Sequence, residues 1–134
     1  MVRILLTGGA GFIGSSLCDQ LIKGNYFVYV LDNLSTGKMI NIPKHKNIKF
    51  IKVDVNNNKK LIDKTKNLKI DYIFHFAACV GVIRTINNPL TVINDIDGFK
   101  NIFNLAISKK IKRIFFSSSS EVYGEGKGYA QNEE

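Results

Sequence analysis

The sequence predicts an α/β domain in which a parallel sheet carries helices on both faces. Short apolar runs rich in strand-forming residues alternate along the chain with segments of helical periodicity. A glycine-rich segment directly follows the first apolar run, and 134 residues have room for one compact domain. Because parallel strands joined through helices form right-handed units, we expect a doubly wound sheet with the strand order 3-2-1-4-5.

The first strand and the first helix are expected next to each other. Residues 2–7 form an apolar run that ends at glycines, which indicates a buried strand. Residues 12–23 repeat apolar side chains at four-residue spacing, which predicts a helix with one apolar face. The Gly-Asn pair at 24–25 lies where such a helix is expected to end.

Two more strands are expected before residue 60. Residues 26–31 and 48–53 are apolar runs of strand length, each followed by an aspartate. Between them, residues 33–47 form a long polar connection that contains a proline. A lysine-rich helix over about 58–67 follows the third strand, so the βαβ alternation continues.

The second half of the chain repeats this alternation. Residues 71–76 and 112–117 are predicted to be the fourth and fifth strands. A loop is expected from the fourth strand to Pro89, which is well placed to open a helix. Residues 90–110 are the longest helical pattern, and residues 118–134 are a Ser/Gly-rich tail without helical periodicity.

The composition narrows the function classes. The formal net charge is +8, but the lysines are scattered through polar loops rather than gathered on a basic helix, so we expect no nucleic-acid partner. No apolar run approaches the ~20 residues that a membrane span needs, so we expect no membrane association. Cys18 and Cys79 lack the spacing of a metal or redox motif, and we expect both to be reduced in a cytoplasmic protein.

The glycine-rich segment Thr7–Gly14 (TGGAGFIG) carries the first chemical signal. Gly8, Gly11 and Gly14 have the spacing GxxGxxG between an expected strand and an expected helix. Small residues there let the backbone approach a pyrophosphate, whose charge then lies at the positive end of the helix. A purely structural tight turn is the alternative.

Asp32, at the end of the second expected strand, independently favours a dinucleotide. A carboxylate at this position accepts hydrogen bonds from both hydroxyls of an adenosine ribose and repels a 2′-phosphate. We therefore predict NAD rather than NADP as the cofactor.

Five ordered segments carry a family resemblance: TGGAGFIG at 7–14, DNLSTG at 32–37, DV at 54–55, HFAA at 75–78 and SSSSEVYG at 117–124. Together they resemble the extended short-chain dehydrogenase/reductase family of sugar-nucleotide epimerases, dehydratases and decarboxylases. The resemblance implies a Rossmann-type fold, a tightly held NAD that is recycled, and a nucleotide-sugar substrate, most often a UDP-sugar. It also implies that a sugar hydroxyl is transiently oxidised to a ketone and later reduced.

The resemblance also implies where the cofactor lies. Asp54 and Val55 would flank the adenine, and Ala77 and Ala78 the nicotinamide side. Asn94 matches the family's Asn-x-x-x-Gly on the helix beside the nicotinamide, although an ordinary exposed helix asparagine is the alternative. The full set of implied cofactor residues is Gly8, Gly11, Phe12, Ile13, Gly14, Asp32, Asn33, Ser35, Thr36, Gly37, Asp54, Val55, Phe76, Ala77, Ala78 and Asn94.

The implied catalytic residues are Ser119, Ser120 and Glu121. Ser119 matches the family's serine or threonine that hydrogen-bonds the reacting sugar oxygen, and a plain loop is the alternative. Dehydratases carry an Asp-Glu pair where this chain has Ser120 and Glu121. The segment is more similar to UDP-glucuronate decarboxylases, whereas residues 78–89 are more similar to epimerases, so both decarboxylation and 4-epimerisation stay open.

The family's Tyr-x-x-x-Lys pair is not found at its expected place. Tyr123 and Lys127 have the spacing, but they follow Ser119 too closely and enclose two glycines. We therefore expect residues 1–134 to be an incomplete NAD-binding domain without the catalytic helix and substrate domain, and to be inactive alone. A stand-alone nucleotide-binding module is the alternative. The helix 90–110 carries more apolar residues than one core-facing stripe needs. The resemblance implies that this helix pairs across a homodimer, so we expect self-association through it or poor solubility.

Overall fold

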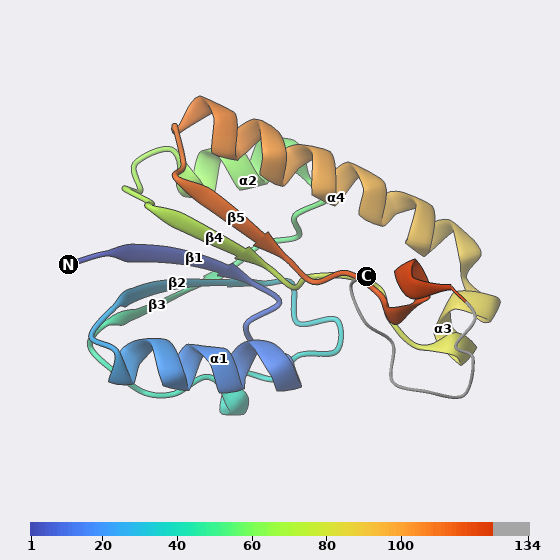
Figure 1. Cartoon of the computed structure of the whole chain (residues 1–134), viewed down its shortest axis with the longest axis horizontal. Helices are drawn as coiled ribbons and strands as arrows, with labels where there is room; N and C mark the ends of the chain where they lie inside the picture. Colours follow the sequence, from blue (N-terminus) through green and yellow to red (C-terminus); the bar gives the residue numbers. More distant parts are fainter. Residues whose placement is uncertain (125–134) are drawn as a thin grey trace.

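The computed structural model describes residues 1–124, and they form a five-stranded parallel sheet between two layers of helices. Figure 1 shows α1 on one face of the sheet and α2 with α4 on the other. The elements are β1 (Arg3–Thr7), α1 (Phe12–Lys23), β2 (Phe27–Asp32), η1 (Met39–Asn41), β3 (Ile48–Lys52), α2 (Asn58–Thr65), β4 (Tyr72–His75), α3 (Val82–Asn87), α4 (Pro89–Ser108), β5 (Arg113–Phe116) and η2 (Ser120–Tyr123).

The strand order is β3-β2-β1-β4-β5, which confirms the predicted topology. All four pairings are parallel, and β1 lies between β2 and β4. Leu5 is in register with Tyr29 on one side and with Ile73 on the other. The strand order therefore reverses direction at β1. The carboxyl ends of β1, β2 and β4 meet at one edge of the sheet, and this is where open α/β sheets bind their ligands.

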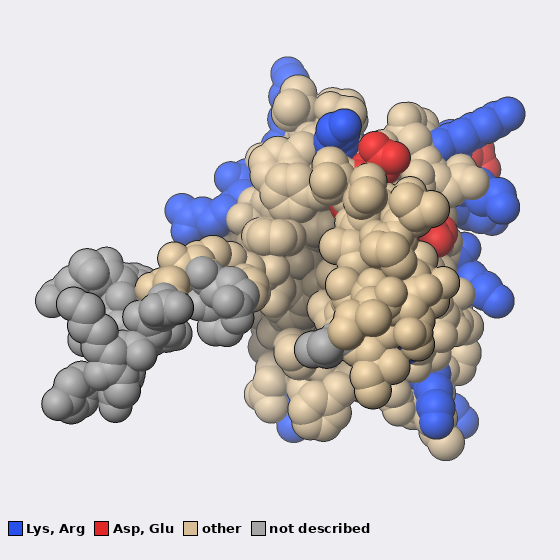
Figure 2. Space-filling model, turned by 90° about the vertical axis from the view of Figure 1, so that its right-hand side faces the viewer, with Lys and Arg blue, Asp and Glu red and all other residues tan. Residues whose placement is uncertain are grey.

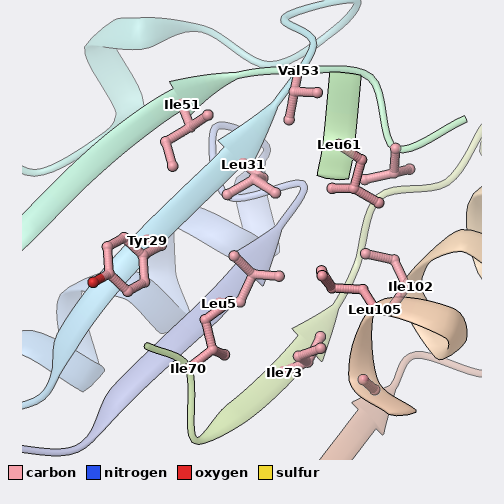
Figure 3. Close-up of a cluster of buried hydrophobic side chains, with 12 residues drawn as sticks. Leu5, Tyr29, Leu31, Ile51, Val53, Leu61, Ile70, Ile73, Ile102 and Leu105 are labelled. Carbon is pink, nitrogen blue, oxygen red and sulfur yellow. The ribbon is translucent and has the colours of Figure 1, made fainter. Parts of the chain in front are cut away.

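Alternate residues of β1 belong to two separate cores, because successive side chains of a strand point to opposite faces. Leu5 packs with strand neighbours, with Leu61 of α2 and with Ile102 of α4 (Figure 3). Leu6 packs with Val28, Val30 and with Cys18 of α1. Both β1 leucines are fully buried, so the segment that precedes the glycine-rich turn is rigidly held.

One sequence prediction about the elements was wrong. The segment before Pro89 was expected to be a loop, but Val82–Asn87 forms the short helix α3, which packs beside α4. The β-branched residues of this segment favour strand or loop locally, and its described side chains are mostly exposed, but backbone hydrogen bonds such as that from the Thr85 amide to the Gly81 carbonyl close the helix. In the tail, Ser120–Tyr123 forms a 3-10 turn, and residues 125–134 lie outside the described part of the chain.

Other predicted bounds shift by a few residues. The lysine-rich helix ends at Thr65 rather than near residue 67, and the longest helix covers Pro89–Ser108 rather than 90–110. Within residues 1–124 no helix has the length and apolar character needed to cross a membrane.

Candidate functional site

A cavity of about 830 Å³ opens at the carboxyl ends of the strands, between the β1–α1 turn and the start of α4. This volume lies in the range of small-molecule and cofactor sites. Figure 2 views this end of the molecule and shows a hollow framed mainly by uncharged residues, with lysines and arginines projecting from the periphery.

The glycine-rich turn builds the floor of the cavity. Gly8 has a φ of +70°, which favours glycine, and a Cβ there would lie 2.8 Å from the backbone that follows β4. A Cβ on Gly14 would lie 2.2 Å from the Gly8 carbonyl oxygen, so this glycine lets α1 approach the turn. Gly11 is the N-cap residue of α1 and has no side chain to cap it, and the first turn carries no acidic residue. The positive end of α1 is therefore free to face an anion.

Asp32 links the glycine-rich turn to the connection after β2. Its carboxylate is buried and accepts hydrogen bonds from the Ala10 amide at 2.9 Å and the Leu34 amide at 2.7 Å. The Ala10 carbonyl in turn accepts from the Lys38 amide at 3.1 Å and from Asn41 Nδ2 at 2.8 Å. A carboxylate has about four acceptor positions, so two remain for a ligand.

Asp54 forms the neighbouring part of the wall, next to the end of β3. Asp54 Oδ2 accepts from Asn33 Nδ2 at 3.1 Å, and Oδ1 accepts from the Asn56 amide at 2.9 Å. The end of the cavity on the β2–β3 side thus offers two carboxylates, each held by the loop that follows its strand.

Thr7 and His75 join β1 to β4 at the centre of the site. The buried Thr7 Oγ1 accepts from the amides of Phe76 and Ala77, both at 3.1 Å, and lies 2.7 Å from His75 Nδ1. Because both acceptor positions of the hydroxyl are used, its hydrogen is donated to His75 Nδ1. Nδ1 is then an acceptor, and the proton of the neutral ring is on Nε2.

The protonation of His75 agrees with this arrangement. Burial lowers the pKa of His75 to about 4, and the Asp95 carboxylate opposes this shift. His75 is 4% exposed and packs near the rings of Phe99 and Phe116. His75 is therefore a buried histidine at the end of β4 that also lines the cavity.

The structure brings all sixteen of the predicted cofactor residues to this one cavity. Its lining includes Gly8, Gly11, Phe12, Ile13, Gly14, Asp32, Asn33, Ser35, Thr36, Gly37, Asp54, Val55, Phe76, Ala77, Ala78 and Asn94. The three predicted catalytic residues are not among the described lining residues. Ser119 is exposed just beyond β5, while the side chains of Ser120 and Glu121, and Lys127 as a whole, lie outside the described part of the structure.

Several lining residues were missed by sequence reasoning. They are Leu31, Val53, Asn56, Cys79, Val80, Arg84, Thr91, Asp95, Phe116, Ser117 and Ser118. The serines directly precede Ser119, so the strand end alone could have indicated them. Cys79, Thr91 and Asp95 carry no local signal, because only the packing of α4 against the loop after β4 brings them together. Among residues 1–124 no cluster of histidine, cysteine and acidic residues suited to a metal ion is found, and Cys18 and Cys79 are free thiols.

Comparisons with known proteins agree with this geometry. The sequence profile described as the NAD dependent epimerase/dehydratase family matches residues 4–134. The chain is 38% identical over 132 residues to the UDP-N-acetyl-alpha-D-glucosaminuronate decarboxylase of Bacillus cytotoxicus, covering 92% of this chain and 38% of that protein. It is 36% identical over 129 residues to the UDP-glucose 4-epimerase of Dictyostelium discoideum, covering 92% and 38%.

A solved structure shows the same architecture. The UDP-glucose 4-epimerase of Thermus thermophilus, in complex with NAD, superposes with a TM-score of 0.90 at 30% identity, covering 98% of this chain and 43% of that one. The chain therefore spans about two fifths of the length of each of these three relatives.

Proposed function

The chain belongs to the NAD dependent epimerase/dehydratase family, and on that basis we propose that it is the NAD-binding part of an enzyme that modifies the sugar of a nucleotide sugar. One observation carries the proposal. The glycine-rich turn and Asp32 lie at the point where the strand order reverses, and the sixteen cofactor residues implied by the family resemblance line one cavity there.

The residues of the cavity fit a dinucleotide. The turn at Gly8 brings the backbone to the cavity floor, and the uncapped start of α1 suits a pyrophosphate. Asp32 keeps two acceptor positions for the ribose hydroxyls, and its negative charge disfavours a 2′-phosphate. Asp54 and Val55 line the cavity on the same side of β1 as Asp32, and they would flank the adenine.

The opposite half of the cavity would face the nicotinamide and the sugar. Ala77, Ala78 and Asn94 line this half. When bound, NAD supplies an acceptor for hydride from the sugar and returns it later. Ser119 would hydrogen-bond the reacting hydroxyl, and Ser120 and Glu121 would act on the sugar ring beside it. A UDP-sugar is the proposed substrate, since the relatives named above act on UDP-sugars, and both decarboxylation and 4-epimerisation fit this arrangement.

We further propose a cytoplasmic homodimer that pairs through α4, without a nucleic-acid or membrane partner. Ile93, Ile96 and Ile107 of this helix are 59%, 56% and 74% exposed, which leaves an apolar face uncovered. A second copy of the same helix matches this face in length and character, as an isologous contact requires. A monodisperse monomer by light scattering would contradict this pairing.

Calorimetric titration with NAD and NADP tests the cofactor proposal. We expect NAD to bind at least tenfold more tightly than NADP. We expect Asp32→Ala to weaken NAD binding by roughly ten- to a hundredfold, because hydrogen bonds to a charged group contribute about 1.5–3 kcal/mol. Asp63→Ala, which removes an exposed carboxylate paired with Lys66 on α2, is the matched control. Equal affinity for NAD and NADP would show that Asp32 does not contact the ribose.

Product analysis by mass spectrometry separates the two reactions. The complete gene product is incubated with NAD and either UDP-glucuronate or UDP-glucose. Loss of carbon dioxide from UDP-glucuronate identifies a decarboxylase, and conversion of UDP-glucose to UDP-galactose with UDP-glucuronate unchanged identifies a 4-epimerase. We expect residues 1–134 alone to give neither product, and any turnover by them would contradict the assignment of this chain as the cofactor-binding part only.

A further inference from the structure

The loop after β4 forms the wall of the cavity on the side away from Asp32. Its residues 76–80 all line the cavity. Asp32 is the last residue of β2 on one side of β1, and this loop follows β4 on the other side. The position of the loop therefore sets the shape of the half of the cavity that lies away from Asp32 and Asp54.

The loop is fixed at two points. At its start, Thr7 Oγ1 accepts from the amides of Phe76 and Ala77. At its far end, the backbone amide of Cys79 donates to Asp95 Oδ2. Cys79 Sγ also lies 3.3 Å from Thr91 Oγ1. The first anchor belongs to the sheet, and the second belongs entirely to α4.

Asp95 differs from its neighbours on α4. Thr91 and Asp95 are four residues apart, so both face the loop from the same side of the helix. Asp95 is half-buried, whereas Asn94, Ile96 and Asp97 are exposed. A hydrogen bond from a backbone amide to a carboxylate is stronger than one between neutral groups, so Asp95 is the main constraint on this end of the loop. Its neighbour Asp97 faces Lys100 instead, at 3.8 Å.

We propose that Asp95 is a positioning residue that holds the loop 76–80 against α4 through the Cys79 amide, and thereby sets the affinity of the site for the nicotinamide half of NAD. This inference rests on the proposed function, since it takes NAD as the ligand. Asp95 acts through the backbone of the loop, so an uncharged acceptor of the same shape preserves most of the effect, and the adenosine half of the cofactor is insensitive to it.

The test compares NAD with ADP, which carries only the adenosine and diphosphate part of the cofactor. Binding is measured by calorimetry for the full chain, for Asp95→Ala, for Asp95→Asn and for the matched control Asp97→Ala. We expect Asp95→Ala to weaken NAD binding about tenfold while ADP binding stays within about twofold, because one charge-assisted hydrogen bond is lost. Asp95→Asn retains an acceptor and restores NAD affinity to within about threefold, and Asp97→Ala matches the unsubstituted chain.

Amide hydrogen exchange gives a second readout that needs no ligand. We expect the Cys79 amide to be protected in the free chain and in Asp95→Asn, and to exchange at least tenfold faster in Asp95→Ala. If Asp95→Ala does not fold, exchange of the Cys79 amide is compared in the unsubstituted chain and in Asp95→Asn. Rapid exchange of this amide in either protein would overturn the proposal.

The remaining outcomes separate this inference from the proposed function. A parallel loss of NAD and ADP affinity in Asp95→Ala would mean a general effect on the fold. Unchanged NAD affinity in Asp95→Ala, or an Asp95→Asn variant as weak as Asp95→Ala, would also refute positioning through the loop. If the unsubstituted chain binds ADP and NAD, these results concern Asp95 alone. If it binds neither, the proposed function fails and this inference fails with it.

Discussion

Replacing Thr7 by valine tests the hydrogen-bonded centre of the site without changing the size of the side chain. The hydroxyl serves three groups: His75 Nδ1 and the amides of Phe76 and Ala77. The Phe76 amide also donates to the Thr7 carbonyl at 3.2 Å, so it keeps a partner in the variant. The Ala77 amide and His75 Nδ1 lose theirs.

The expected destabilisation follows from these two groups. A buried polar group without a partner costs about 1–3 kcal/mol. The contact of the Ala77 amide is only partly buried, so its loss lies near the lower end of this range. We therefore expect Thr7→Val to lower the free energy of unfolding by about 2–4 kcal/mol. At about 3 °C per kcal/mol for a domain of this size, the melting temperature falls by roughly 6–12 °C.

Thr65→Val is the matched control. Thr65 is also fully buried, but its hydroxyl donates to the Leu61 carbonyl, which already has a helical partner, so the substitution leaves no orphaned group. We expect a loss below about 1 kcal/mol. Urea unfolding followed by circular dichroism measures both variants. Equal losses in Thr7→Val and Thr65→Val would refute the assignment of the hydroxyl as a donor to His75 and an acceptor for the loop.

Two further predictions concern stability. The pKa of His75 is about 4 in the folded chain and near 6.5 when unfolded, so the unfolded chain takes up a proton first and stability falls as the pH drops from about 6.5 to 4. The difference between the two pKa values corresponds to about 3 kcal/mol of stability. Urea unfolding measures this pH dependence, and the same dependence in a His75→Gln variant would exclude His75 as its source. Lys109 Nζ donates to the carbonyls of Lys66 and Leu68 just beyond α2, at 3.1 and 3.0 Å. We expect Lys109→Met to cost about 1 kcal/mol and Lys64→Met, on the exposed surface of α2, to cost less than half of that, with thermal melting as the measurement.

The sheet was predictable because its signals are local. Each strand is a short apolar run closed by glycine, aspartate or a polar loop, and the glycine-rich turn identified where the first βαβ unit begins. Helix α3 was not predictable, because Val82–Asn87 is short and β-branched and its described side chains are mostly exposed, so no apolar periodicity marks it as a helix.

Most of the residues that line the site were predictable from sequence motifs, but the contacts that hold them in place were not. Asp32 was predicted to accept hydrogen bonds from the ribose hydroxyls, and the structure shows that its carboxylate also fixes the amides of Ala10 and Leu34. That double role depends on how the connection after β2 folds back over the glycine-rich turn. The contact of Asp95 with Cys79 likewise depends on the rotation of α4 about its axis, which no spacing in the sequence reveals.

The central place of β1 also determines when the site comes into existence during folding. Its pairing with β2 joins residues 24 positions apart, such as Arg3 with Phe27, and is complete within the first helical connection. Its pairing with β4 must wait until a segment 68 positions away arrives, such as His75 beside Thr7. Closing the longer loop costs more chain entropy, so the two halves of the cavity meet late. A ligand that spans both halves recognises only the closed state, and it therefore slows unfolding rather than accelerating the early steps of folding.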